Sequence, residues 1–435
     1  MEKRRKPLPM ETLPRDELEK LQNRRLRYTL REAYEHTLFW HEKFDSLGIK
    51  PEDIKNKEDL EKAYEKGLKV TKEDLIKEFD KLLPDYVKEN RIFFEEMWTS
   101  GFGGVPKRII VTKDTYKLIK ETGNYLLNSM NLRKGDRVLS LLAPSPYSSG
   151  KQSREVLKDY PIWLLEIAVP IPPAHLLNIL RFFRPTHLWG LSSKIEEIGY
   201  KISELGVNPS SLGIEKILVS GESTTKAGRK RIEEKWGAEV FDTLGSTECG
   251  IWGYECEYHN YLHVPETRVL LSVTHPKTDE IVGVNEEGKD LITTLYEENE
   301  IPGMFLINYS HGDLLKLINE KCECGRTFQK IDYPRREDEV INIAGVKLYV
   351  RDIEGAPIRN YIVVSEYNRE KRKHILEIRV VPQKNIEDKE IEDLVLYHLF
   401  SSNPAALELI REKSDIKVKI YDESKLYKDL NISCV

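Results

Sequence analysis

The feature that most constrains this chain is a regular alternation of short apolar runs with amphipathic segments between residues 108 and 248. Such alternation indicates parallel β-α-β units. Ligands of these sheets gather at the carboxyl ends of the strands, and polar segments follow two of the expected strands, at residues 221–223 and 245–248. We expect strands at residues 137–142, 186–191, 214–220 and 239–244, and helices at residues 194–205 and 225–236.

The segments on either side of this alternation follow other patterns. Between residues 14 and 90, apolar side chains such as Leu18, Leu26 and Leu30 recur at helical spacing, which predicts a helical N-terminal part. Between residues 260 and 318 we expect a smaller β subdomain, with β-rich runs at residues 269–273, 290–295 and 304–309. Beyond residue 338 we expect strands at residues 340–343, 361–364, 375–381 and 416–421 and a helix at residues 390–400.

These patterns predict an α/β fold in two domains. The first, residues 1–336, is a large domain of mixed and parallel sheets with helices and a small β subdomain. The second, residues 337–435, is a small α+β domain. The length of 435 residues is sufficient for such a division.

Charge and hydrophobicity indicate which partners and which cellular location to expect for this chain. The formal net charge of -5 gives no basic field of the kind that nucleic acid attracts. No run approaches the ~18 apolar residues of a membrane helix, and the charged start followed by proline and glutamate does not resemble a signal peptide. We therefore expect a cytoplasmic protein that binds neither nucleic acid nor membrane.

A glycine-rich loop, TSGFGGVPK at residues 99–107, carries the strongest chemical signal. Glycines let backbone N–H groups approach an anion closely, and hydroxyls and an ammonium add donors and charge. The loop is not a Walker A motif, because a strand at residues 108–112 follows it where that motif requires a helix. It therefore predicts a hairpin lid over the phosphates of a nucleotide, with an ordinary glycine-rich turn as the alternative.

The glycine-rich loop is one of eight motifs along the chain whose order and spacing are informative together. They are residues 39–54, the lysine-led segment 72–75, the loop 99–107, the Arg-Pro-Thr at 184–186, Gly-Glu at 221–222, DTLGSTE at 242–248, His-Gly-Asp-Leu at 311–314 and residues 336–354. In this order and spacing the chain resembles the adenylate-forming enzymes, and within them the phenylacetate–CoA ligase group, from about residue 25 to about residue 380.

The resemblance implies a set of nucleotide-contacting residues. The expected nucleotide contacts are Thr99, Ser100, Gly101, Gly103, Gly104, Lys107, Gly221, Glu222, Asp242, Leu244, Gly245, Ser246, Thr247, Glu248, Asp313 and Arg336. Among them Thr99, Ser100 and Lys107 would hold the β and γ phosphates, and Glu248 would bind Mg²⁺, a hard cation that prefers carboxylate oxygen. Asp313 would accept hydrogen bonds from the ribose hydroxyls, and Arg336 would contact ribose or phosphate. Arg336 could equally form a surface ion pair with a neighbouring acid.

The resemblance also implies a mobile C-terminal domain with Asp338 at its hinge and a catalytic lysine near the chain end. Lys428 is the candidate for this lysine, and Glu248 and Lys107 are the other expected catalytic groups. Lys425 is an equal alternative to Lys428, because the glycine that precedes the catalytic lysine in the family precedes neither of them. The phosphate loop departs from the family in Phe102 and Gly103, which replace hydroxyl residues, and Leu244 replaces an aromatic residue expected to cover adenine.

Four of the five cysteines lie in the second half of the large domain, too few and too clustered for a disulfide framework. Cys256, His263, Cys322 and Cys324 supply three thiolates and one imidazole, a complete tetrahedral set for a structural Zn²⁺. The phenylacetate–CoA ligase group has a similar arrangement. His259 could replace His263, and the alternative without metal is a group of reduced thiols.

Three functions remain open from the sequence. The first is ATP-dependent adenylation of an organic acid, with an aryl acid as one case, followed by thioester formation with CoA. The resemblance implies ATP/AMP, Mg²⁺ and CoA for this reaction. The second is a CoA-independent adenylyltransferase acting on a phenolic hydroxyl, such as that of a deazaflavin coenzyme. The third is a non-catalytic relative that binds a nucleotide. The expected partner is a small-molecule acid, with a homodimer as one arrangement of the chain.

Overall fold

The computed structural model describes residues 6–99, 106–142, 148–167, 171–222, 224–336, 340–343, 346–349, 353, 355–368, 373–383, 386–399 and 414–421. The chain divides into two compact units, one of residues 1–223 with 232–334 and the other of residues 224–231 with 335–435. The domain boundary expected after residue 336 and the homodimer stay predictions.

The N-terminal part is helical, as expected. A 3-10 turn η1 (Pro9–Thr12) leads into α1 (Arg15–His36), α2 (Leu38–Leu47), η2 (Pro51–Asp53), α3 (Lys57–Glu65), α4 (Lys72–Lys77), α5 (Phe79–Leu82) and α6 (Asp85–Lys88). Side-chain caps fix several starts: Thr37 accepts from the Trp40 amide, and Thr71 and Asp74 form a capping box. These caps set where α2 and α4 begin within the apolar pattern of residues 14–90.

A hairpin and a long helix follow. Strands β1 (Phe94–Trp98) and β2 (Arg108–Thr112) pair antiparallel, with Trp98 opposite Arg108. The strand–loop–strand setting of the glycine-rich segment is thus confirmed, although residues 100–105 lie outside the described part of the chain. Helix α7 (Lys113–Ser129) begins directly after β2, where Thr112 caps it by accepting from the Thr115 amide.

The alternating region forms a parallel sheet. Its elements are β3 (Arg137–Ser140), α8 (Ser148–Leu157), β4 (Trp163–Glu166), α9 (Pro173–Phe183), β5 (His187–Gly190), α10 (Ser192–Glu204), η3 (Pro209–Leu212), β6 (Lys216–Ser220), α11 (Lys226–Trp236) and β7 (Glu239–Ser246). The strands lie in the order β7-β6-β5-β3-β4, and each neighbouring pair is parallel. The predicted β-α-β units are confirmed.

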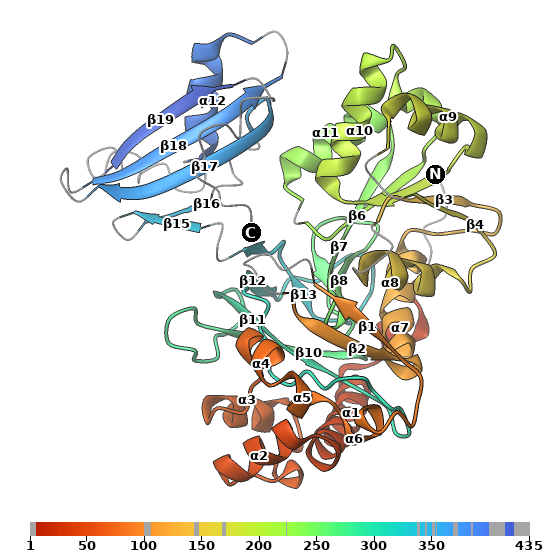
Figure 1. Cartoon of the computed structure of the whole chain (residues 1–435), viewed down its shortest axis with the longest axis vertical. Coiled ribbons are helices and arrows are strands. Elements are labelled where there is room, and N and C mark those ends of the chain that lie inside the picture. The colour runs from red at the N-terminus through yellow and green to blue at the C-terminus, as the bar shows by residue number, and fades with distance from the viewer. Residues whose placement is uncertain are drawn as a thin grey trace. The chain divides into compact units, whose positions relative to one another are not determined.

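The β-rich segment continues the same sheet instead of forming a separate one. Strands β8 (Gly250–Glu255), β9 (Leu262–His263), β10 (Val269–Thr274), β11 (Glu287–Thr294), β12 (Asp313–Ile318) and β13 (Lys330–Ile331) extend it in the order β10-β11-β12-β13-β9-β8-β7. Each of these neighbouring pairs is antiparallel. The sheet changes from parallel to antiparallel pairing between β7 and β8, which are labelled in Figure 1, because the turn at residues 247–249 reverses the chain.

One β-rich expectation is wrong. Residues 304–309 do not form a strand, although the bridge between Ile292 and Tyr309 and a hydrogen bond from the Thr294 amide to the Leu306 carbonyl oxygen join this stretch to β11. Asn308 has a positive φ of 49° and turns its side chain away to donate to the Leu68 carbonyl oxygen at 2.9 Å. This left-handed residue breaks the register that a continuous strand would need.

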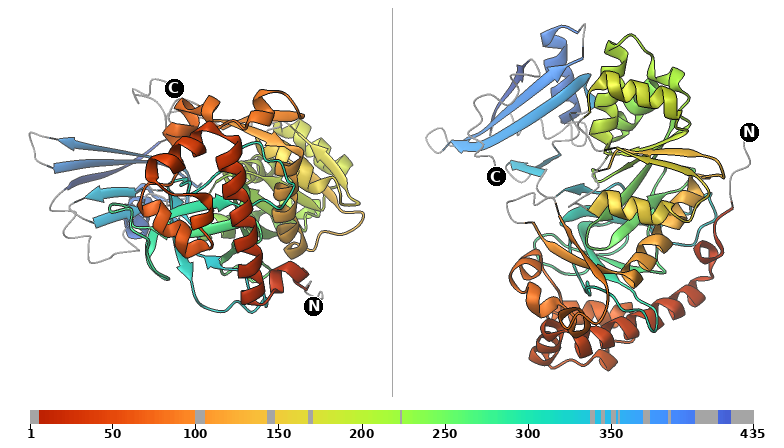
Figure 2. Two further views of the ribbon diagram at one scale, coloured as in Figure 1. Left: turned by 90° about the horizontal axis from the view of Figure 1, so that it is seen from below. Right: turned by 45° about the vertical axis from the view of Figure 1, so that its right-hand side comes forward.

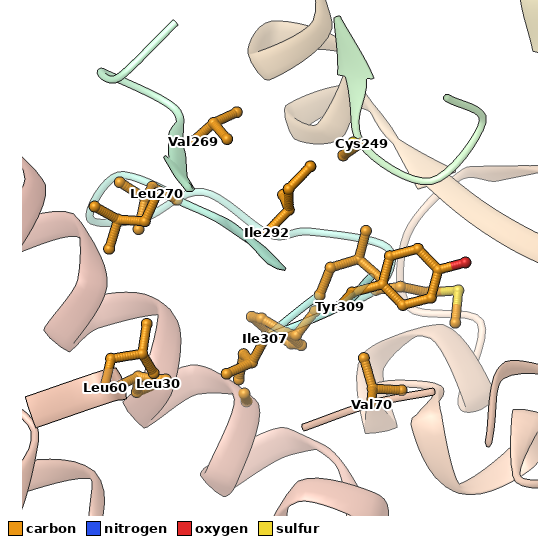
Figure 3. Packing of buried hydrophobic residues seen from close by; sticks show 14 of the residues in the cluster. Leu30, Leu60, Val70, Cys249, Val269, Leu270, Ile292, Ile307 and Tyr309 are labelled. Atoms are coloured by element: carbon orange, nitrogen blue, oxygen red, sulfur yellow. The ribbon is translucent and has the colours of Figure 1, made fainter. Parts of the chain in front are cut away.

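Apolar clusters cover both faces of the sheet. Helices α7 and α8 pack with Val138, Leu218 and Phe241 on one face, and helices α9, α10 and α11 pack with Leu139, Ile217 and Val240 on the other. The N-terminal helices form a third cluster with β10 and β11, in which Leu30 and Leu60 lie near Leu270 and Ile292 (Figure 3). Figure 2 shows these helices, in red and orange, beside the strands that they cover.

The second unit has its own core. Strand β14 (Arg335–Arg336) and the hairpin β15 (Val340–Ile343) with β16 (Val346–Tyr349) precede a three-stranded sheet of β17 (Ile358–Asn368), β18 (Lys373–Pro382) and β19 (Ser414–Ile420). Helix α12 (Asp388–Leu399) packs Ile391, Val395 and Leu399 against this sheet. The mixed α/β fold and the α+β character of this part are confirmed.

Candidate active site

The base of the glycine-rich hairpin is closed by two residues predicted to hold phosphates. The Thr99 amide donates to the Lys107 carbonyl oxygen at 3.1 Å, and the Lys107 amide donates to Thr99 Oγ1 at 3.0 Å. Both residues are thereby fixed at the mouth of the loop. Ser100, Gly101, Gly103 and Gly104 lie outside the described residues.

Lys107 and Glu248 form a buried ion pair at this mouth. Lys107 Nζ contacts Glu248 Oε1, and it also donates to the Tyr309 hydroxyl at 3.0 Å. Tyr309 in turn donates to Glu248 Oε1 at 3.0 Å, so the three side chains close a triangle. The Glu248 side chain is only 3% exposed and that of Lys107 is 17% exposed.

The charge of Glu248 is fixed by its neighbours. Burial raises the pKa of this carboxyl, but Lys107 and the imidazole of His311 outweigh burial and lower the pKa to about 2. Burial and the adjacent Glu248 carboxylate raise the pKa of Tyr309 far above its usual range. The site therefore holds an ionised carboxylate, an ammonium and a neutral phenol around one point, which suits a hard cation and phosphate oxygens.

The turn between β7 and β8 carries Ser246, Thr247 and Glu248. Ser246 Oγ accepts from the Cys249 amide at 3.2 Å, and Thr247 Oγ1 lies 2.7 Å from Ser148 Oγ at the start of α8. A Cβ on Gly245 would lie 3.1 Å from the Gly250 carbonyl oxygen, so this close backbone approach favours glycine. The turn thus points its polar groups toward α8 and the hairpin mouth.

The loop before β12 carries Asp313, the predicted ribose contact. A carboxylate on the neighbouring strand β11 organises this loop, because Asp290 accepts from the amides of His311, Gly312 and Asp313 at 2.9, 3.0 and 2.9 Å. Gly312 has a φ of 81°, and a Cβ there would lie 3.4 Å from Lys72 Nζ. Asp313 is buried at the start of β12.

His311 connects this loop to the β7–β8 turn. Its Nδ1 lies 2.7 Å from Asp290 Oδ2, and its Nε2 lies 2.9 Å from Ser246 Oγ. The ring stacks on Trp252 with centroids 5.4 Å apart and planes 8° apart. Burial lowers the pKa of His311, but the Asp290 carboxylate raises it well above its ordinary value.

Four other predicted nucleotide contacts lie directly after β6 or within β7. Glu222 accepts from Ser193 N at 3.0 Å and from the hydroxyls of Ser192 and Ser193 at 3.1 and 2.9 Å, so it caps the start of α10. Gly221 takes a φ of 82° in the turn after β6. Asp242 is buried within β7, and Leu244 packs against the cluster of the N-terminal helices.

The two pairs of predicted metal ligands meet at one point. One ligand atom from each of Cys256, His263, Cys322 and Cys324 lies within 4.8 Å of every other. Cys256 Sγ and Cys322 Sγ are 3.6 Å apart, and Cys324 Sγ and His263 Nε2 are 3.5 Å apart. Ligands of tetrahedral zinc with metal–sulfur bonds of about 2.3 Å lie about 3.8 Å from one another. The separations and the donor set fit such a centre.

Neighbouring strands bring these ligands together. Cys256 follows β8 and His263 lies in β9, while Cys322 and Cys324 lie in the turn between β12 and β13, which pairs with β9. His259 is not part of the group, because its Nδ1 lies 2.9 Å from Glu255 Oε2 and its Nε2 lies 3.1 Å from Glu239 Oε1. Cys249 lies beside Ser246 instead.

Several residues that were singled out from the sequence are not placed in the site by the described part of the structure. Lys428, Lys425, Asp338 and Phe102 lie outside the described residues. Arg336 lies in β14. Their roles, and the assignment of the other nucleotide contacts, stay predictions.

Two residues of the site, Tyr309 and Asp290, were not singled out from the sequence, and His311 was named only as part of the His-Gly-Asp-Leu motif. Tyr309, Asp290 and His311 complete the hydrogen bonding around Glu248, Asp313 and Ser246. Tyr309 and His311 stand within five residues that end in the predicted Asp313, so their place next to that motif was the available signal. Asp290 lies on another strand and has no such signal.

Comparison with known proteins supports the resemblance. No protein-family model matches the chain. It is 25% identical to a phenylacetate-coenzyme A ligase of Thermus thermophilus over 362 residues, which covers 82% of this chain and 79% of the relative. It is 23% identical to the phenylacetate-coenzyme A ligase of Escherichia coli over 373 residues, or 80% and 77% of the two chains.

The fold also matches a solved ligase. A 2-hydroxyisobutyryl-CoA ligase in the postadenylation state, in complex with 2-HIB-AMP, superposes with a TM-score of 0.81 at 22% identity over 95% of this chain and 88% of that one. Among the described residues, no helix combines the length and apolar character needed to span a bilayer. The chain is thus a homologue of enzymes named phenylacetate-coenzyme A ligases and has the fold of the adenylate-forming acid–CoA ligases.

Proposed function

We propose that this protein activates an organic acid with ATP and transfers the acyl group to CoA. The curated relatives are named as ligases that join phenylacetate to coenzyme A, and the similar solved ligase binds an adenylate. The observation that carries the proposal is the buried triangle of Lys107, Glu248 and Tyr309 at the mouth of the glycine-rich hairpin.

The triangle suits the first half of the reaction. The substrate carboxylate attacks the α-phosphorus of ATP, which gives an acyl adenylate and pyrophosphate. Lys107 would then pair with phosphate oxygens, and the Glu248 carboxylate, freed from Lys107, would hold Mg²⁺. Mg²⁺ would supply charge neutralisation on the triphosphate. Because both residues exchange one partner for another, neither charge is left buried alone.

The neighbouring residues suit the positioning of the nucleotide. Asp313 would accept from the ribose hydroxyls, and Thr99 together with Thr247 would donate to phosphate oxygens. Positioning and electrostatic stabilisation account for most of the rate in reactions of this type. In the second half, the thiolate of CoA attacks the acyl carbonyl carbon and AMP leaves.

We also propose that Cys256, His263, Cys322 and Cys324 hold a structural Zn²⁺. Their mutual separations and chemistry support it. With four protein ligands the metal has no open position, so it would fasten the turn before β13 to strands β8 and β9 and take no part in the reaction. A reaction that consumes ATP and CoA also suits the cytoplasmic location expected from the sequence.

The test is product formation with a panel of acids. Purified protein is supplied with ATP, Mg²⁺, CoA and one acid at a time, including phenylacetate, other aryl acids and 2-hydroxyisobutyrate. The proposal expects an acyl-CoA thioester and AMP, both detected by mass, with at least one acid. AMP transfer to a phenol without any need for CoA would instead support an adenylyltransferase.

A further inference from the structure

We propose that Asp290 and His311 are positioning residues that lock the turn bearing Ser246 and Glu248 to the loop bearing Asp313. This inference rests on the proposed function, because it assigns the two loops to one nucleotide site. Neither Asp290 nor His311 needs to touch the substrate to do this. They act through hydrogen bonds to the residues that do.

Asp290 organises the loop before β12 by accepting from it with both carboxylate oxygens. Oδ1 accepts from the amides of Gly312 and Asp313 and from Ser310 Oγ, the last at 3.2 Å. Oδ2 accepts from the amide and ring Nδ1 of His311. The side chain is fully buried in β11, so it fixes the loop from a rigid element.

His311 extends this arrangement to the second loop. With Nδ1 held by Asp290, its Nε2 faces Ser246 Oγ at 2.9 Å, and Cys249 Sγ lies 3.8 Å from the same nitrogen. Trp252 stacks on one face of the ring, and Tyr309 packs edge-on with centroids 4.9 Å apart. The imidazole therefore has one orientation, and that orientation sets the place of Ser246.

The groups facing His311 explain its role as a donor. They are Asp290 on β11, Tyr309 in the same loop, Asp313 at the start of β12, and Glu248 and Cys249 in the turn before β8. Three of them are carboxylates, and the Asp290 carboxylate keeps the imidazole protonated. A protonated imidazole donates to Ser246 and cannot take its proton, which argues against a serine nucleophile. It also places a positive charge that favours the ionised form of Glu248.

The same contacts argue against a metal at this place. One ligand atom from each of Asp290, His311 and Asp313 lies within 4.8 Å of the others, which is close enough for a cation. However, both oxygens of Asp290 already accept hydrogen bonds from N–H or O–H donors, and such donors would repel a cation. The Asp290 carboxylate therefore binds the backbone of the loop before β12, and a metal ion could bind there only by displacing that loop.

The experiment is a double-mutant cycle between His311 and Ser246, read by Mg²⁺-dependent ATP–pyrophosphate exchange. The variants are His311→Ala, Ser246→Ala and the two combined, with His311→Gln as a conservative replacement that keeps a neutral N–H donor in place of the imidazole. His187→Gln is the matched control, because His187 is a buried histidine of β5 in the parallel sheet. Thermal unfolding and metal content identify any variant that does not fold.

The inference expects His311→Ala to lower kcat about 10- to 100-fold. The double variant should lose little more than His311→Ala alone, because both act through one hydrogen bond. His311→Gln should recover part of the kcat that His311→Ala loses. In the pH–rate profile of His311→Gln, the fall in activity on the acidic side, the acidic limb, should move to higher pH, because the loss of a neighbouring positive charge raises the pKa of Glu248. His187→Gln should change the melting temperature alone. If His311→Ala does not fold, His311→Gln and Ser246→Ala complete the cycle.

Two outcomes separate the inference from the function on which it rests. If the wild type catalyses exchange but the losses at His311 and Ser246 multiply independently, or His311→Gln leaves the acidic limb in place, the inference is wrong and the function stands. If the wild type catalyses no exchange with any acid, the proposed function fails and the inference fails with it.

Discussion

Lys107 at the base of the β1–β2 hairpin and Glu248 in the β7–β8 turn share one buried ion pair, which the Tyr309 hydroxyl completes. The pair joins the base of this hairpin to the turn between β7 and β8, two interior strands of the central sheet. Its consequences for ligand binding, pH and stability can each be measured.

Replacing Lys107 with methionine should weaken ATP binding while leaving the hairpin closed. The variant keeps the backbone bonds to Thr99 but loses the charge that faces Glu248. We expect the KM for ATP to rise about 10- to 100-fold because a charge-assisted contact to phosphate is lost. Lys113→Met, which alters a lysine at the start of α7, is the control. An unchanged KM for ATP would remove Lys107 from the site.

The lowered pKa of Glu248 predicts a pH dependence of stability. Its folded pKa is about 2 against an ordinary value of 4.5, so the stabilisation is complete above pH 4.5 and is lost as the pH falls toward 2. A shift of this size corresponds to about 3 kcal/mol. The stability difference between wild type and Glu248→Gln should therefore shrink between pH 4.5 and pH 2 in denaturant titrations. A difference independent of pH would show that the pair does not set this pKa.

The cysteine cluster predicts a selective dependence on metal. Cys256→Ser should lower the zinc content from one per chain to near zero and lower the melting temperature, because the turn before β13 loses its fastening. Cys249→Ser is the matched control, because Cys249 is also a buried free cysteine but is hydrogen-bonded to Ser246 and is not one of the four predicted zinc ligands. Equal zinc in Cys256→Ser and wild type would contradict the assignment.

A buried ion pair next to the cysteine cluster predicts that the N-terminal turn η1 contributes to the stability of the fold. Glu11 in η1 and Arg326 are both fully buried and contact each other, and the Tyr254 hydroxyl donates to Glu11 at 2.6 Å. Glu11→Ala would leave Arg326 with Glu257 as its acidic partner and should cost about 3 kcal/mol. Glu19→Ala on the exposed face of α1 should cost less than about 1 kcal/mol. Similar melting temperatures for the two variants would contradict this role.

Sequence reasoning reached the parts of the site whose signal is local. The spacing of Cys256, His263, Cys322 and Cys324 predicted a group that the structure brings together. The glycine-rich loop predicted a hairpin, and the alternation after residue 108 predicted the parallel strands. In each case the pattern lies in a few consecutive residues or in one repeated spacing.

The remainder depended on contacts between distant segments. In the sequence Asp290 looks like an ordinary strand residue. Only the structure shows that β11 brings its carboxylate to the loop that carries His311. The apolar run at residues 304–309 has the composition of a strand, but Asn308 adopts a left-handed conformation that tertiary contacts to Leu68 and Thr293 stabilise. Neither the partner nor the backbone angle can be read from the sequence alone.

The most direct test of the central claim is Mg²⁺-dependent ATP–pyrophosphate exchange by the wild type and Glu248→Gln in the presence of a substrate acid. The account predicts exchange by the wild type that requires the acid, and a loss of at least about 100-fold in the variant with its zinc content and fold intact. Equal exchange by the two proteins would contradict the role of Glu248, and no exchange by the wild type with any acid would contradict the proposed reaction.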